Sequence, residues 1–87
     1  MNTRDAKIIK AALDFLHERE ASLSDMTIRD EVRNRVSPPC GRDEYLAAMK
    51  IADDCGWVVT APASVGDGYR RGISEEGEIA RLKLGRE

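Results

Sequence analysis

The sequence is poor in the residue types that metal sites, disulfide frameworks and most active sites require. It has two cysteines, Cys40 and Cys55, and a single histidine, His17. The cysteines lack metal-ligand spacing and no second histidine joins them, so we expect no zinc site. If a helix separates them, its rise of about 1.5 Å per residue places them roughly 20 Å apart, too far for a disulfide. Both are therefore expected to be free thiols with a structural role.

Long apolar runs and a strongly basic charge are also missing. No run approaches the roughly 20 apolar residues that span a bilayer, and the N-terminus lacks the apolar core of a signal peptide. We therefore expect a cytoplasmic protein with no membrane partner. The formal net charge is −2, whereas nucleic-acid-binding domains usually carry a basic footprint. Any basic surface must be local.

The residues that are present indicate one globular domain. A chain of 87 residues is too short for two domains that each bury a core, so residues 1–87 are expected to form a single unit. With 41% hydrophobic and 34% charged residues, the composition is typical of a folded protein.

No active-site pattern is legible in the sequence. An enzyme needs convergent groups, such as a nucleophile with a base, paired carboxylates, or a glycine loop that opens a helix. Gly66, Asp67 and Gly68 lie between two expected strands and indicate a turn instead. His17 lies at an expected helix end, where the helix dipole explains its placement. We therefore expect a non-enzyme with no cofactor, no metal and no small-molecule ligand.

Apolar periodicity predicts three helices in the first two thirds of the chain. The first spans about residues 4–20, and its broad apolar stripe indicates a helix that crosses the middle of the domain, with contact to a second copy as the alternative. The second is expected to start at Thr27, where the residues approach a capping box, and to end before the Ser37–Pro39 run. The third spans Arg42–Cys55 and stops at Gly56.

A β-hairpin is expected after the third helix. Residues 57–60 are the β-branched and aromatic residues of a strand that Pro62 closes, and residues 63–68 have the composition of a turn. Residues 69–73 return as the second strand, with a candidate bulge at Gly72.

The return strand leads into a closing helix. Ser74 is its expected N-cap, and Gly77 weakens it by roughly 1 kcal/mol relative to alanine, so packing must hold the first turn. In the strand, Arg70 is expected on one face, and the two-residue period places three residues on the other face: Tyr69, Arg71 and Ile73.

The stretches Gly56–Val59 and Tyr69–Gly77, with the order of elements over nearly the whole chain, resemble the winged helix-turn-helix superfamily. The most specific part is the return strand that runs through Ile73 and Ser74 into a short acidic turn with glycine, as in small bacterial regulators of the MarR and PadR kind. The resemblance implies an α+β winged helix, with three helices, a two-stranded β-hairpin wing and a C-terminal helix. It marks a fold, and only loosely a function.

In that superfamily the second and third helices form a helix-turn-helix, the third lies in the DNA major groove, and the wing touches the backbone. The resemblance therefore implies that the helix over Arg42–Cys55 contacts the bases of the DNA. Its outward residues are expected to be Asp43, Ala47, Lys50 and Asp54. Two of these are acidic, which departs from the family pattern because phosphates repel carboxylates.

The cationic residues of these elements are the candidate DNA contacts: Arg42 and Lys50 on the third helix, Arg29, Arg33 and Arg35 on the second, and Arg70 and Arg71 on the wing. They suit phosphate contacts, which fix position without reading sequence. The arginines of the second helix also fit an ordinary solvated face, and strand arginines also protect a sheet edge. Trp57 and Tyr69 are expected in the core, rather than as a platform for bases.

Two hypotheses about function follow. In the first, the chain is a small bacterial or phage transcriptional regulator that binds double-stranded DNA as a homodimer, with Arg42 and Lys50 near bases and the wing arginines on the backbone. In the second, the same scaffold is a protein-interaction module whose acidic third helix meets a basic protein partner. The first follows from the resemblance and the second from the charge.

Overall fold

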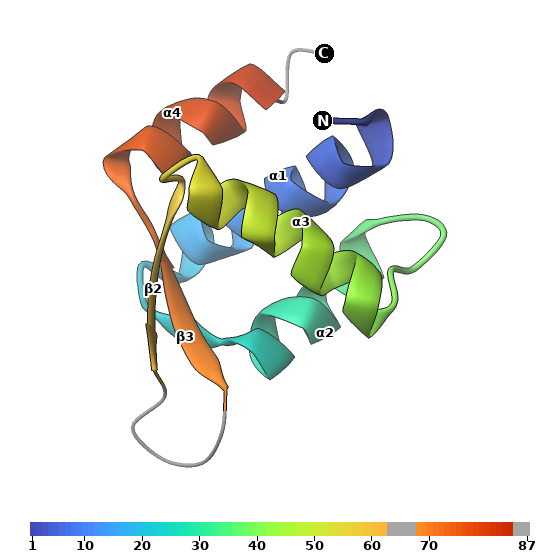
Figure 1. The fold of residues 1–87 in the computed structure, drawn as a ribbon, viewed down its shortest axis with the longest axis horizontal. Coiled ribbons are helices and arrows are strands. Elements are labelled where there is room, and N and C mark those ends of the chain that lie inside the picture. The colour runs from blue at the N-terminus through green and yellow to red at the C-terminus, as the bar shows by residue number, and fades with distance from the viewer. Residues whose placement is uncertain (63–67, 85–87) are drawn as a thin grey trace.

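The computed structural model describes residues 1–62 and 68–84. In order these residues form α1 (Thr3–Arg19), β1 (Leu23–Ser24), α2 (Asp25–Arg35), α3 (Arg42–Asp54), β2 (Val58–Pro62), β3 (Tyr69–Ile73) and α4 (Glu75–Leu84) (Figure 1). The prediction of an α+β fold with three helices, a hairpin and a closing helix is confirmed. None of the helices in this part of the chain is long and apolar enough to cross a membrane.

Helix α1 is the centre of the domain. It lies behind α3 in Figure 1, with α4 on one side and α2 on the other, and it contacts α2, α3, α4 and β3. Its residues Ile8, Ile9, Leu13 and Leu16 are fully buried. The broad apolar stripe is therefore buried by contacts within one chain, which confirms that this helix crosses the middle of the domain.

Helix α2 begins two residues earlier than predicted. Its N-cap is Ser24, whose Oγ accepts a hydrogen bond from the amide of Thr27 at 3.3 Å. Thr27 is therefore inside the first turn, and its prediction as the start of the helix is wrong. Ser24 and Thr27 have the same capping chemistry three residues apart, so the sequence alone does not separate them. The end of α2 at Arg35, just before the proline run, is as predicted.

The sheet contains a third strand that the sequence did not predict. The strand order is β1-β3-β2, with β3 antiparallel to both neighbours. Strand β1 has only two residues, Leu23 and Ser24, which pair with Arg71 and Arg70. The sheet is three-stranded at Arg70 and Arg71, where β1 pairs with β3. Strand β1 thereby joins the hairpin to the start of α2.

The hairpin register is regular along β2 and β3. Val59 pairs with Gly72 and Thr60 with Arg71, so the predicted bulge at Gly72 is wrong. Gly68 has a φ of 110°, in the region where the predicted turn needs glycine. The rest of that turn, including Gly66 and Asp67, lies outside the described residues.

Helix α4 is attached by its first turn. The Oγ of Ser74 accepts a hydrogen bond from the amide of Gly77 at 3.0 Å, and the amide of Ser74 donates to the carbonyl of Trp57 at 3.1 Å. A Cβ on Gly77 would lie 2.0 Å from that same carbonyl oxygen. The glycine is therefore required for the close approach of α4 to Trp57, and the predicted Ser74 cap is confirmed.

Candidate nucleic-acid interface

A groove of about 510 Å³ lies between the start of α2, the first turns of α3 and the first residues of β3. Two arginines line it, Arg29 from α2 and Arg42 from α3. Two of its apolar lining residues are largely exposed, Met26 at 68% and Tyr69 at 52%. Asp25 also lines the groove, which therefore combines two guanidinium groups and one carboxylate with accessible apolar surface.

Both groove arginines are available to an anion. Within residues 1–62 and 68–84, neither Arg29 nor Arg42 takes part in an ion pair. Arg42 is the first residue of α3. The N-cap of this helix is Gly41, which has no side chain that could accept a hydrogen bond from the amides of the first turn. The free amides of a helix N-terminus carry partial positive charge, which adds to the charge of the guanidinium.

A polar network holds the elements that border the groove. Asp25, the first residue of α2, accepts hydrogen bonds from Tyr45 Oη at 2.8 Å and from Arg71 Nε at 2.6 Å. Arg71 Nη1 also donates to Thr60 Oγ1 at 3.0 Å, and that hydroxyl donates to Asp53 at 3.2 Å. The network joins α2, α3 and both hairpin strands, so the wing and the helices keep a fixed relative orientation.

Tyr45 is the most buried member of this network. It is 1% exposed, and burial, with the neighbouring carboxylate of Asp25 as the next cause, raises the pKa of its phenol. The phenol therefore stays protonated and donates to Asp25. This donation satisfies a hydroxyl that would otherwise be costly to bury.

Arg71 does not have the exposed position expected of a phosphate contact. It is 7% exposed, and its guanidinium is bound by Asp25 and Thr60. The sequence placed it correctly on the same face as Ile73, but that face is turned toward the helices. The prediction that Arg70 and Arg71 act together on a phosphate is therefore corrected: only Arg70 is exposed.

The two other predicted contacts on α3 and the wing remain at the surface. Lys50 Nζ lies 3.1 Å from Asp54, with the two side chains 75% and 65% exposed, a geometry in which ion pairs contribute little. Arg70 donates from Nη2 to the carbonyl of Ser22 at 2.6 Å. Both side chains are accessible, although Lys50 has a carboxylate beside it.

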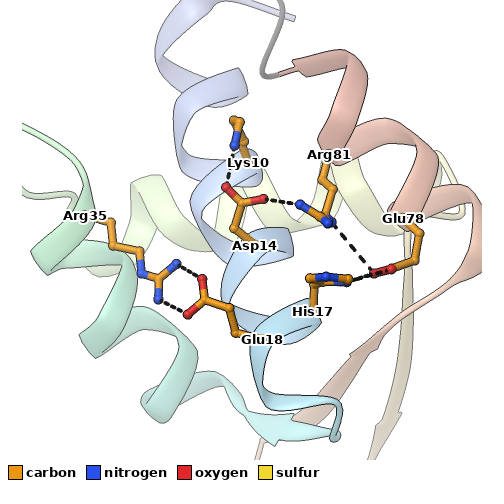
Figure 2. A network of polar contacts seen from close by, with 7 residues as sticks. All are labelled: Lys10, Asp14, His17, Glu18, Arg35, Glu78 and Arg81. Carbon is orange, nitrogen blue, oxygen red and sulfur yellow. Dashed lines mark hydrogen bonds and ion pairs between the residues drawn. The ribbon is translucent and has the colours of Figure 1, made fainter.

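The arginines of α2 point in different directions. Arg33 is exposed on another surface depression, next to Asp30 and Pro39. Arg35 donates to Glu18 through both terminal nitrogens, as Figure 2 shows, and to Glu31 through Nε at 2.8 Å. Arg35 therefore serves the packing of α2 on α1, and Arg29 is the α2 arginine that the structure brings together with Arg42.

The outward face of α3 agrees with the helical projection. Its four predicted residues are all exposed: Asp43, Ala47, Lys50 and Asp54. The opposite side buries Tyr45, Met49 and Ala52. Because Asp54 neutralises Lys50, this outward face carries net negative charge, and the positive charge of α3 is concentrated at Arg42.

The two hairpin aromatics have different environments. Trp57 was predicted to lie in the core, and it is partly buried against it. Tyr69 is 52% exposed, so its prediction as a core residue is wrong. Tyr69 pairs with Pro62 at the end of the sheet farthest from α4, where the strands extend past the helices (Figure 1). It was missed because strand alternation indicates a face and does not reveal where the covering helices end.

The charged residues on the α4 side of α1 form a second polar network. Asp14 binds Lys10 and Arg81, and His17 Nδ1 lies 2.7 Å from Glu78 (Figure 2). The contacts of Arg81 and Glu78 join α4 to α1, and Glu78 gives His17 a structural partner that the sequence did not identify.

The cysteines and acidic residues provide no metal centre in the described part of the chain. No group of three or more histidine, cysteine, aspartate or glutamate residues within it is arranged to hold a metal ion. Cys40 is buried, Cys55 is exposed, and both are free thiols, as predicted. Burial raises the pKa of the Cys40 thiol, which agrees with a structural role for this residue.

No protein-family model matches the chain, and neither a curated protein nor a solved structure is significantly similar to it.

Proposed function

We propose that this protein binds double-stranded DNA through the groove formed by α2, α3 and the hairpin, in the manner of a winged helix-turn-helix regulator. The observation that carries the proposal is the meeting of Arg29 and Arg42 in one groove without an ion-pair partner among the described residues. Guanidinium groups that are not committed to carboxylates are suited to phosphate binding.

The remaining candidates have unequal roles in this proposal. Arg70 lies on the strand that borders the groove and contacts the phosphate backbone. Lys50 sits on the outward face of α3 beside Asp54 and contributes less, because its partner must be displaced or tolerated near DNA. Arg33 is a peripheral contact at most, and Arg71 is a structural residue that positions the wing. The order of helices and strands is compatible with the winged-helix arrangement that the sequence resembles.

A second candidate function is binding of a basic protein partner by α3. The specific observation in its favour is the exposed outward face, where Asp43 has no cation beside it among the described ion pairs and Lys50 is paired with Asp54. Such a face repels phosphate and attracts lysine-rich or arginine-rich surfaces.

Duplex DNA of random sequence, titrated at several salt concentrations and followed by fluorescence anisotropy, tests the main proposal. We expect binding at low salt that weakens steeply, with a slope of about −0.9 per neutralised phosphate in a plot of log K against log salt. The double variant Arg29→Ala/Arg42→Ala should lower the magnitude of that slope by up to about 2.

The matched control is Lys7→Ala/Arg19→Ala, which removes the same charge from two exposed residues of α1. We expect the control to bind almost as well as the unaltered protein. Equal losses for the two double variants would mean that only net charge matters and would contradict the groove assignment. If the unaltered protein does not bind DNA at low salt, the proposal is wrong, and binding to an oligolysine peptide that Asp43→Asn weakens would favour the second candidate.

A further inference from the structure

Tyr69 and Met26 are large apolar side chains that the fold leaves at the surface, and both line the groove between α2, α3 and β3. Tyr69 is 52% exposed and Met26 is 68% exposed. Strand β1 ends at Ser24, which pairs with Arg70, so the neighbouring residue Tyr69 lies beside the first turn of α2. Exposed apolar surface that gathers in one groove and is rimmed by polar residues is typical of a binding site.

Two residues of α3 extend this apolar surface. Tyr45 and Leu46 also line the groove, and they are buried and half-buried. The groove volume of about 510 Å³ falls within the roughly 300–1,000 Å³ that is typical of small-ligand sites. The groove can therefore accept a flat aromatic group. The ring of Tyr69 can stack on the face of such a group, and the thioether of Met26 can contact its edge.

The charged residues of the groove favour phosphate beside that aromatic group. Arg29 and Arg42 take part in no ion pair among the described residues. The carboxylate of Asp25 accepts from Arg71 Nε at 2.6 Å and from Tyr45 Oη at 2.8 Å, so its charge is balanced within the fold. The two groove guanidinium groups come from different helices, and each is suited to a phosphate. A base within a strand, with a phosphate on each side, has this chemistry.

We infer that the groove takes an unpaired base of DNA, which stacks on Tyr69 while the phosphates that flank it contact Arg29 and Arg42. In an intact duplex the faces of the bases are covered by their neighbours, so only base edges and the backbone are accessible. The apolar surface of Tyr69 and Met26 gains little from phosphate. A bulged or mismatched base costs least to take out of the stack. The inference rests on the proposed function, and it specifies a duplex with an unpaired nucleotide as the DNA that is bound most tightly.

Three duplexes of one sequence test the inference by fluorescence anisotropy at a fixed low salt concentration. The first is fully paired, and the second carries one bulged adenine. The third carries an abasic residue at the bulge, which keeps the extra phosphate and the local flexibility but lacks the base. We expect the bulged adenine to tighten binding by about tenfold relative to both other duplexes, because of its stacking on one aromatic ring. Equal affinity for the two bulged duplexes would overturn the inference.

Tyr69→Ala and Tyr69→Phe test whether the ring provides the stacking. We expect Tyr69→Ala to remove the preference for the bulged adenine, whereas Tyr69→Phe keeps the ring and should keep the preference. The control is Val59→Ala, which shortens a side chain that is 61% exposed on β2 and does not line the groove. It should keep the preference too. A preference that survives Tyr69→Ala, or that Val59→Ala also abolishes, would overturn the assignment of the base to Tyr69.

The outcomes separate this inference from the proposed function. Equal binding of all three duplexes would overturn the inference and leave DNA binding through the groove intact, whereas binding of none of them at low salt would overturn both. Binding of the bulged-adenine duplex alone would support the inference and contradict the proposed binding of intact duplex. Deoxyadenosine monophosphate offers the same base with one phosphate and no strand. If it displaces the bulged duplex at micromolar concentration, the groove is a site for a free nucleotide and the inference is wrong.

Discussion

Arg70 and Arg71 are neighbours in the sequence and have opposite roles in the structure. Successive side chains of a strand point to opposite faces of the sheet. Arg71 is therefore turned toward Asp25, which lies 2.6 Å from its Nε, while Arg70 stays exposed and donates to a backbone carbonyl. Asp25 accepts from Arg71 and from Tyr45 at once, so one carboxylate connects the wing to two helices.

Arg71→Met should destabilise the fold by about 2 to 4 kcal/mol, because it leaves Asp25 without its cationic partner in a partly buried site. The matched variant Arg70→Met removes an exposed guanidinium from the next residue and should cost less than about 1 kcal/mol. Urea denaturation followed by circular dichroism measures both values. Equal costs would show that the Asp25–Arg71 pair does not hold the wing.

The first turn of helix α4 contains a residue that helix propensity disfavours. Gly77 lies in its first turn, and an added Cβ would be 2.0 Å from the carbonyl oxygen of Trp57 and 2.8 Å from Cγ1 of Ile73. Real Cβ atoms do not approach a carbonyl oxygen so closely, so the helix or the segment before β2 must move if a side chain is added. Packing between elements therefore overrides the local preference for alanine.

Gly77→Ala distinguishes the two effects by its sign. Helix propensity alone predicts a gain of about 1 kcal/mol, whereas the clash with Trp57 predicts a loss of about 2 kcal/mol or more. We expect the loss, measured by thermal and urea unfolding. Gly41→Ser is the control, because a Cβ at Gly41 meets nothing within 4 Å and serine is a good N-cap for α3, so we expect a change of only a few tenths of a kcal/mol. A stabilised Gly77→Ala variant would contradict the packing explanation.

The elements that could be predicted from the sequence are those whose signal extends over several residues. The apolar periodicity of α1 and α3 and the alternation of β3 gave bounds within about two residues of those observed. Strand β1 was missed because two residues carry no periodicity, and its existence depends on a partner strand that follows some 45 residues later. The start of α2 was misplaced because Ser24 and Thr27 both have capping hydroxyls.

The candidate interface was less predictable than the elements that carry it. The helical projection found the exposed face of α3, since exposure follows from a fixed 100° step. It did not show that Arg29 and Arg42 share a groove, or that Arg71 is bound by Asp25, because these contacts join residues far apart in the chain. Nothing in the sequence around Asp25, the first residue of α2, indicated that its side chain would bind Arg71 in β3.

At the scale of the whole molecule, α1 is joined to the other helices by ion pairs at its surface. Glu44 of α3 accepts from Arg4 at 2.8 Å, and Glu18 accepts from Arg35 of α2 at 2.7 Å. In both cases the hydrogen bond from the arginine holds the pKa of the carboxyl group below its ordinary value of 4.5. These carboxylates report on whether the helices are docked.

A carboxyl group with a lowered pKa in the folded state makes stability depend on pH in a definite direction. Between the folded and the unfolded pKa, the unfolded chain binds more protons, so the free energy of unfolding rises with pH. The contribution of Glu18 and Glu44 is therefore fully present above about pH 4.5 and is lost as the pH falls through their lowered folded values.

Glu18→Gln and Glu44→Gln should each reduce the loss of stability between neutral and acidic pH, measured as the urea midpoint at each pH. Asp30→Asn, at an exposed residue of α2 with no ion pair among the described residues, is the control and should follow the unaltered protein more closely. Added salt screens exposed pairs and should bring the Glu18 and Glu44 variants closer to the unaltered protein, whereas a difference that persists in high salt would mean that the two glutamates act through packing instead of charge.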